Sequence, residues 1–443
     1  MGLGGGTYTV QNKILPGIYV NIKTAAAQVG NQSASGVVAV PIILNWGPTN
    51  QIFSVTAEDF YKNSMQLFGY PYGAPQLLAL RELFRGAARA YLYRVAAADA
   101  VAASNTYATA KYAGTRGNDI KIVIATDVDD AELYKVSTYV GAELTDLQTV
   151  AKAADLKDND FVTFKTDATL SATAGEALSG GNDGAAVTVA QYQAFLDAVE
   201  TYSFKALCCP SDTEEVKSLF AAYGKRMREE RGARFQTVLY KKAADYEGSI
   251  NVTNAATGFT ARNLGVGAYG LVYFAAGITA GCALNHSNTN RIYDGELTVD
   301  VGATQLELEQ AIKAGEFKMH NVAGEIRVLE DINSLVSFTE ERGENFRYNQ
   351  TVRAVDQLAT DIAALFASDY MGKIANDEAG RLSLWNDICK IIQTHVNNGV
   401  FNDFETDIVS VLPGEAVDAV ECSIDGLTVA YTMAKLYLRM YIW

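Results

Sequence analysis

Residues 36–44 read GVVAVPIIL, a run in which every residue after the glycine is apolar. A strand of a parallel sheet that is covered on both faces shows such a run, whereas a strand with one face in water alternates apolar and polar residues. Helix and strand patterns then follow one another through residues 56–95, and again from residue 190 to residue 240. This alternation predicts an α/β fold in which helices cover a mostly parallel sheet, with residues 36–95 and 190–325 in one core.

The composition changes between residues 96 and 188. Short alternating runs, such as IKIVIAT at 120–126 and FVTFKT at 161–166, lie between clusters of Gly, Asp, Asn and Thr. Several short strands separated by turn residues are typical of an all-β domain. We therefore expect a small β domain that interrupts the α/β core.

The part that begins near residue 326 shows a strand, two helices and a further strand. IRVLEDI at 326–332 predicts the strand, and helices are expected at about 350–367 and 378–397, with Gly399 ending the second. The apolar side chains that recur at helical spacing, and are expected to point inward, are Val352, Val355, Leu358, Ile362, Leu365, Leu384, Ile388, Ile392 and Val396.

Strand patterns also occupy both ends of the chain. KLYLRMYIW at 435–443 alternates, and ILPGIYVNIK at 14–23 does so after its Pro-Gly break. In each pattern the apolar residues fall on one face of the expected strand. They are Ile18, Val20 and Ile22 in the first, and Leu436, Leu438, Met440 and Ile442 in the second. A strand with no chain after it can add to the sheet edge of another copy, with its register set by the alternation. The alternative is an internal strand of the chain's own last sheet.

Charge and cysteine usage exclude several classes of protein. The net charge is −15 and no long basic run occurs, which argues against nucleic acid as a partner. The five cysteines form no CxxC pair, so reduced, buried thiols in a protein made in a reducing cytoplasm are expected.

No secretory signal is present, and residues 264–284, the nearest approach to a membrane span, are rich in Gly and Ala. A buried element is expected there, and no direct membrane insertion.

No motif for catalysis or cofactor binding stands out. GVGAYG at 265–270 matches a dinucleotide-binding pattern in its letters but lacks a convincing strand before it. His286, His320 and His395 have no second ligand at metal-binding spacing, so each is expected to be structural. We therefore predict that the chain is not an enzyme, with no catalytic residue, no cofactor and no metal. A hydrolytic enzyme that uses the α/β core is the alternative.

Four stretches of the chain resemble the contractile tail sheath family of myophages and R-type bacteriocins, in its short, prophage-like form. They are LPGIYVNIK at 15–23, KYAGTRGNDIKIVI at 111–124, LSGGNDGA at 178–185 with AADYEGSINVTN at 243–254, and VLEDINSLVSFT at 328–339 with its continuation to VLPGEAVDAV at 411–420. Ala113 stands where the family usually has proline. The resemblance runs nearly from end to end.

The resemblance implies a subtilisin-like α/β core, an inserted β-sandwich domain and a C-terminal α/β domain, with strand-forming arms at both termini. The expected boundaries are 1–27 for the N-terminal arm, 28–95 and 189–325 for the core, 96–188 for the β-sandwich, 326–434 for the C-terminal domain and 435–443 for the C-terminal arm strand.

The resemblance also implies a function. Sheath subunits stack as hexameric rings around an inner tube and contract to drive that tube through a cell envelope. The implied partners are other copies of the chain, the inner tail tube protein, the baseplate and the tail terminator. The particle is a phage tail or a bacteriocin, assembled in the cytoplasm of a bacterial host. A non-contracting tube or capsid protein is a further alternative.

Two sets of residues carry these contacts in the implied assembly. The arm strands that would join subunits contain Ile18, Tyr19, Val20, Ile22, Leu436, Leu438, Met440 and Ile442. The basic residues of the C-terminal domain that would contact the tube are Lys373, Arg381 and Lys390.

Overall fold

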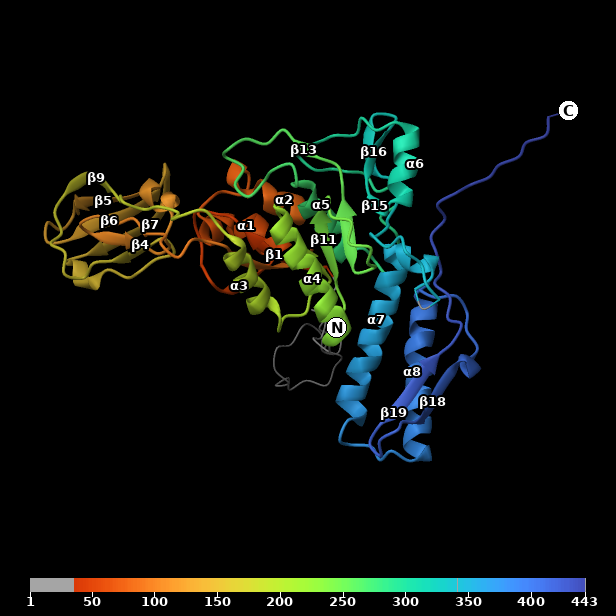
Figure 1. The fold of residues 1–443 in the computed structure, drawn as a ribbon. Coiled ribbons are helices and arrows are strands. Elements are labelled where there is room, and N and C mark those ends of the chain that lie inside the picture. The colour runs from red at the N-terminus through yellow and green to blue at the C-terminus, as the bar shows by residue number, and fades with distance from the viewer. Residues whose placement is uncertain (1–35, 341, 443) are drawn as a thin grey trace, which may run out of the picture. The chain divides into compact units, whose positions relative to one another are not determined.

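A computed structural model of the chain describes residues 36–340 and 342–442 (Figure 1). Its largest sheet has seven strands in the order β15-β12-β11-β10-β1-β3-β2, all parallel except β2. These strands are β1 (Val37–Ile42), β2 (Ile52–Thr56), β3 (Arg89–Arg94), β10 (Ala206–Cys208), β11 (Gln236–Tyr240), β12 (Ser249–Val252) and β15 (Glu316–Phe317). All six residues of β1 are buried, as its continuous apolar run predicts. The predicted α/β fold is confirmed.

Helices cover both faces of this sheet. Val38 and Val40 of β1 pack in one apolar cluster with α2 and α5, whereas Val37 and Ala39 pack in another with α3 and α4. The helices of this part are α1 (Ala57–Phe68), α2 (Leu78–Leu83), α3 (Val189–Val199), α4 (Glu214–Glu230) and α5 (Leu271–Gly281). Thr56 caps α1 together with Asp59, as expected for a threonine before a helix.

Helix α5 explains the uncharged segment at 264–284. Ten of its residues are buried, and its glycines allow α2 to approach closely. A Cβ on Gly277 would lie 2.1 Å from the carbonyl oxygen of Leu83, and one on Gly281 2.0 Å from that of Gly86. The predicted buried element is therefore a core helix. Among the described residues, no helix combines the length and the apolar character that crossing a bilayer requires.

The segment between β3 and α3 forms the predicted β domain. A four-stranded sheet, in the order β7-β6-β5-β9, shares one apolar core with the two-stranded sheet β4-β8. The strands are β4 (Ala108–Ala110), β5 (Ile120–Thr126), β6 (Tyr134–Val140), β7 (Glu143–Val150), β8 (Val162–Phe164) and β9 (Thr173–Ala177). Ile120, Ile122 and Ile124 alternate into this core, which accounts for the alternating run in the sequence.

The stretch 111–119 attaches the β domain to the core. Arg94, at the end of β3, donates to the carbonyl oxygens of Leu44, Gly47 and Ala113. Burial lowers the pKa of Arg94 to about 10. Gly114 has φ +133°, and a Cβ there would lie 2.2 Å from the carbonyl oxygen of Asn45. Only glycine fits this close approach, which gives a physical reason for the glycine in KYAGTRGND.

Short elements occur in all parts of the described chain. They are β13 (Ala256–Thr257), β14 (Thr298–Val299), α6 (Gln305–Lys313), β16 (Met319–Val322) and β17 (Glu325–Val328), with short helical turns at Pro75–Leu77, Thr115–Asp119, Ala153–Asp155, Glu344–Arg347, Phe366–Tyr370 and Thr406–Ile408. The strand predicted at 326–332 was too long, because β17 ends at Val328. Asp331 and Asn333 beyond it are buried in a polar network. His320 lies within β16.

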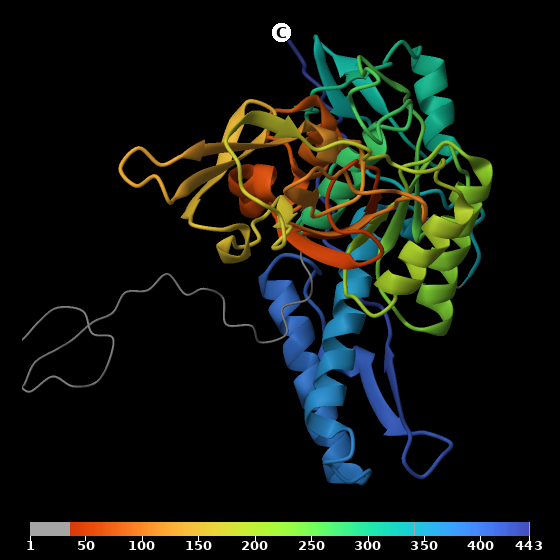
Figure 2. The same ribbon diagram turned by 90° about the vertical axis from the view of Figure 1, so that its left-hand side faces the viewer.

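Two helices and a hairpin follow. They are α7 (Asn349–Leu365), α8 (Glu378–Asn397), β18 (Val409–Pro413) and β19 (Val420–Ile424). Figures 1 and 2 both show α7 and α8 side by side, and β18 of the hairpin packs against α8. Val355 was predicted to point inward, and this was wrong, since the residue is 38% exposed. Leu384, Ile388 and Ile392 are buried as expected.

Polar contacts fix the first half of α7 to the core. The buried carboxylate of Asp331 accepts hydrogen bonds from Arg353 at 2.8 Å, from the Asn349 amide at 2.9 Å and from the backbone N–H of Asn288 at 2.9 Å. Burial alone would raise the pKa of Asp331, but Arg353 and these donors hold it below its ordinary value. Replacing a member of such a pair leaves an unpaired charge in the interior.

A second buried ion pair joins α7 to α4. Arg228 donates to both carboxylate oxygens of Asp356, at 2.6 and 3.0 Å, and also to the carbonyl oxygen of Phe235. The amide of Gln236, in β11, donates to Asn349 at 2.8 Å. The contact between α7 and the core is therefore made largely by charged and amide side chains whose partners are specific.

We predict that Asp331→Asn lowers the free energy of unfolding by on the order of 3 kcal/mol at neutral pH, because Arg353 stays buried without its counter-charge. Urea unfolding of both proteins measures this difference. Because the folded-state pKa of Asp331 is depressed, its contribution exists above the unfolded-state pKa and disappears as the pH falls through the folded-state value. The difference between the two proteins should therefore shrink in acid.

Glu58→Gln serves as the control for this variant, because Glu58 pairs with Lys62 on an exposed helix face. It should change the free energy of unfolding by no more than about 0.5 kcal/mol. An Asp331→Asn protein as stable as this control would contradict the role given to the ion pair.

Candidate assembly site

The C-terminal segment, residues 433–442, is exposed on both of its faces. Leu436, Leu438, Met440 and Ile442 are 87%, 69%, 75% and 93% exposed, and Tyr437 and Tyr441 of the other face are 90% and 77% exposed. Large apolar side chains usually lie in a core, and a contiguous exposed set of them marks an interaction surface. Figure 1 shows this segment extending away from α7 and α8. It forms no strand with any sheet of the described residues.

The residues just before this segment are held firmly. Ala430 donates to the carbonyl oxygen of Val400, and Phe401 pairs with Val429. The hydroxyl groups of Tyr431 and Thr351 lie 2.7 Å apart. The chain is thus anchored up to Thr432, and residues 433–442 make no hydrogen bond or ion pair with the rest of the described chain.

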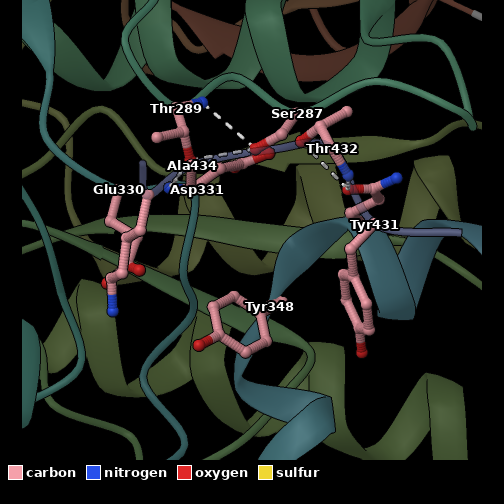
Figure 3. A pocket seen from close by; sticks show the side chains of 10 residues that line it. Ser287, Thr289, Glu330, Asp331, Tyr348, Tyr431, Thr432 and Ala434 are labelled. Carbon is pink, nitrogen blue, oxygen red and sulfur yellow. Dashed lines mark hydrogen bonds between the residues drawn. The ribbon is translucent and has the colours of Figure 1, made fainter. Parts of the chain in front are cut away.

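A pocket of about 290 Å³ lies where the segment leaves the body. Figure 3 shows its lining, which comes from the C-terminal segment, from the start of α7 and from two core loops. The side chains are Ser287, Thr289, Glu330, Asp331, Tyr348, Gln350, Tyr431, Thr432, Ala434 and Lys435. The rings of Tyr348 and Tyr431 meet edge to face at 5.7 Å. The pocket therefore lies at the root of the C-terminal segment, beside the start of α7.

The β18–β19 hairpin offers an open sheet edge. Hydrogen bonds from Gly414 to Ala419 and from Asp425 to Ile408 close the two ends of its antiparallel ladder. In such a ladder every second residue points its N–H and C=O groups away from the partner strand. On β19 these outward residues are Val420, Cys422 and Ile424, and their backbone groups have no partner among the described residues. On β18 the outward carbonyl oxygen of Val409 is taken by Trp385 at 2.9 Å.

The basic residues predicted to contact a tube lie around α8. Lys390 pairs with Asp387 at 2.9 Å. Arg381 donates to Asn376, and Lys373 donates to the carbonyl oxygen of Ser368. Neither Arg381 nor Lys373 has a carboxylate at ion-pair distance among the described residues. Exposed apolar side chains accompany them, namely Met371, Ile374 and Leu382.

Other predicted residues lie elsewhere. Ile18, Tyr19, Val20 and Ile22 fall outside the described residues. His395 contacts Asp361 at 2.9 Å within the helix pair, and GVGAYG precedes α5 without a strand before it. Over residues 36–340 and 342–442, no cluster of three or more His, Cys, Asp or Glu side chains could hold a metal ion.

Sequence reasoning missed Gln350, Tyr431 and the edge of β19. Gln350 and Tyr431 are 81 positions apart, and nothing in their local patterns links them. A glutamine in the first turn of a helix, next to inward apolar positions, was the only available signal.

Four family models match successive parts of the chain. They are described as the tail sheath protein Gp18 domain III N-terminal region (residues 35–95), the phage tail sheath protein beta-sandwich domain (95–183), the phage tail sheath protein central domain (185–334) and the phage tail sheath C-terminal domain (341–443).

Individual relatives agree with these matches. The XkdK protein of the phage-like element PBSX of Bacillus subtilis is 35% identical over 386 residues, which are 81% of each chain. The sheath tail protein of Desulfitobacterium hafniense is 32% identical, with a TM-score of 0.81 over 96% of this chain and 100% of that one. The helical sheath of the anti-feeding prophage in its contracted state is 13% identical and shares the fold, with a TM-score of 0.53 over 97% and 99% of the two chains. The chain therefore belongs to the phage tail sheath protein family.

Proposed function

We propose that the chain is the subunit of a contractile sheath, which stacks as hexameric rings around an inner tube and drives that tube through a cell envelope. Membership of the tail sheath family supports this, and so does the fold shared with a sheath in its contracted state. The observation that carries the proposal is the exposed apolar face of Leu436, Leu438, Met440 and Ile442, which the described part of the chain leaves uncovered.

The C-terminal segment acts as an arm that adds a strand to another copy. A strand added to a sheet edge gains main-chain hydrogen bonds, and alternating side chains set its register. The edge of β19 is the acceptor, because Val420, Cys422 and Ile424 present unpaired backbone groups there. Val420 and Ile424 also pack against the cluster that contains α8. The four apolar side chains of the arm would extend that cluster, each contributing about 1.5–3 kcal/mol on full burial.

The contact is heterologous, since the arm of one copy meets a different surface of the next. Such contacts propagate into rings or helical stacks and do not close as a dimer. Charge favours the same pairing: Lys435 and Arg439 lie on the polar face of the arm, and Glu421 is exposed on the outer face of β19. The strand at residues 18–22 would form a second arm of this kind.

Contraction in this scheme needs no cofactor. The work comes from the difference in packing between two lattice states, summed over many identical subunits and held back by a kinetic barrier. The baseplate would start the transition and the terminator would cap the stack. The sheath would assemble in the host cytoplasm as part of a phage tail or bacteriocin particle, with Lys373, Arg381 and Lys390 facing the tube.

Deleting Lys435–Trp443 should leave a folded monomer that cannot polymerise, because the large apolar side chains of residues 436–442, the described part of this stretch, are exposed and add nothing to the core. Sedimentation and electron microscopy would report assembly, and thermal unfolding would report the fold. Leu438→Asp, on the apolar face of the arm, should have the same effect, whereas Tyr437→Ser on the other face should weaken assembly less. Ordered sheaths formed by the deleted protein would refute the arm proposal.

The acceptor edge can be tested with a matched pair of proline variants. Cys422 and Val411 face each other in the hairpin, and their N–H groups point to opposite outer edges. A synthetic Lys435–Trp443 peptide should bind the arm-deleted protein, and Cys422→Pro should abolish binding by removing an acceptor-edge donor. Val411→Pro should retain it. If titration calorimetry showed that Val411→Pro abolishes binding and Cys422→Pro retains it, the acceptor would be the edge of β18.

Changing Lys373, Arg381 and Lys390 together to glutamine should weaken assembly of the extended sheath around its tube, and more so at low salt, where electrostatic contacts are strongest. Co-assembly of purified sheath and tube proteins, followed by electron microscopy, measures this. Glu378→Gln, an exposed change of the same size on α8, is the control. If the triple variant assembled the extended sheath as well as the unchanged protein, these three residues would not be tube contacts.

A further inference from the structure

The side-chain amide of Gln350 holds the start of the C-terminal arm. Its Nε2 donates to the carbonyl oxygen of Ala430 at 3.0 Å, and its Oε1 accepts from the N–H of Thr432 at 3.3 Å. A residue of a neighbouring parallel strand offers this same pair, one donor and one acceptor for groups two residues apart. Gln350 is only 3% exposed. It therefore acts on the arm as a one-residue strand partner that keeps residues 430–432 extended.

This amide is the last hydrogen-bond partner of the arm within the described residues. The hydroxyl of Thr432 also contacts Oε1 of Gln350, at 3.4 Å. From Met433 to Ile442, no hydrogen bond to the body occurs in the part of the chain that the structure describes. Gln350 thus marks the boundary between the fixed and the free parts of the arm, and Figure 3 shows Thr432 at that boundary.

The neighbouring residue ties the same helical turn to the core. Asn349 donates to Asp331 at 2.9 Å and accepts from Gln236 of β11 at 2.8 Å. One residue later, Gln350 contacts the arm. The first turn of α7 therefore fixes the origin and direction of the arm relative to the central sheet through two consecutive amide side chains.

We propose that Gln350 is a positioning residue for assembly, which holds the first residues of the arm in the extended conformation that docks on the next copy. This inference rests on the proposed docking of the arm. On docking, backbone freedom is lost by the strand itself and by the residues that connect it to the body, and residues 430–432, which are ordered beforehand, reduce that loss. Without Gln350 the acceptor edge is unchanged, but the arm is presented in many directions.

The test compares Gln350→Ala and Gln350→Glu with Gln393→Ala, which removes an exposed glutamine from α8. Hydrogen exchange of the full chain, below its polymerisation concentration, should show faster exchange at Thr432 in Gln350→Ala and little change in the central sheet. Gln350→Glu still accepts from Thr432 but cannot donate to Ala430, so its exchange should be intermediate. The critical concentration for polymerisation should rise about tenfold in Gln350→Ala and remain unchanged in Gln393→Ala.

Peptide binding separates this inference from the docking proposal. The Lys435–Trp443 peptide should bind arm-deleted protein equally well with or without Gln350→Ala, because the β19 edge is intact. If both bind the peptide and the critical concentration is unchanged, the positioning role is overturned while docking stands. Unaltered exchange at Thr432 would also overturn it. If neither protein binds the peptide, docking itself fails, and the positioning role fails with it.

Discussion

The polar contact between α7 and the core determines where the later elements lie. Asp331 with Arg353, and Arg228 with Asp356, are buried ion pairs whose members have specific partners. An apolar contact tolerates sliding, because one methyl group replaces another at small cost. A buried charge that loses its partner costs several kcal/mol, so the contact admits one arrangement. The root of the arm contacts α7 directly, helix α8 packs against α7, and the β18–β19 hairpin packs against α8.

This constraint suits a subunit that transmits force. A displacement of the core reaches the arm only if the joint between them resists rotation. Asn349 and Gln350 lie next to each other and bind the core and the arm respectively. The described segment beyond Thr432 has no hydrogen bond to the body, so in the proposed assembly it would follow a neighbouring copy. The part of the chain that is held by hydrogen bonds and the part without them thus meet at Gln350, which is polar and buried.

Local patterns in the sequence predicted much of the fold. GVVAVPIIL indicated a strand buried on both faces, the short alternating runs indicated a small β domain, and the uncharged, glycine-rich stretch indicated a buried element. The family match confirms the resemblance and the prediction of a structural protein instead of an enzyme. The errors at Val355 and at residues 329–332 share a cause. Where α7 meets the core, polar residues such as Asp331 replace the apolar residues from which an inward face is normally recognised. Their partners lie far away in the sequence, as with Gln350 and Ala430.

The C-terminal arm shows why a strand pattern can be present in a chain that forms no strand there. Alternation of apolar and polar residues stabilises a strand only when a sheet edge supplies hydrogen bonds and a core covers one face. The described chain supplies neither to residues 436–442, so their side chains stay exposed. An exposed apolar strand invites indiscriminate pairing, which charged residues discourage. Lys435 and Arg439 stand on the polar face of the arm, where they oppose pairing between two arms but are compatible with an edge that carries Glu421. In the proposed docking, the pattern would therefore specify a partner as well as a conformation.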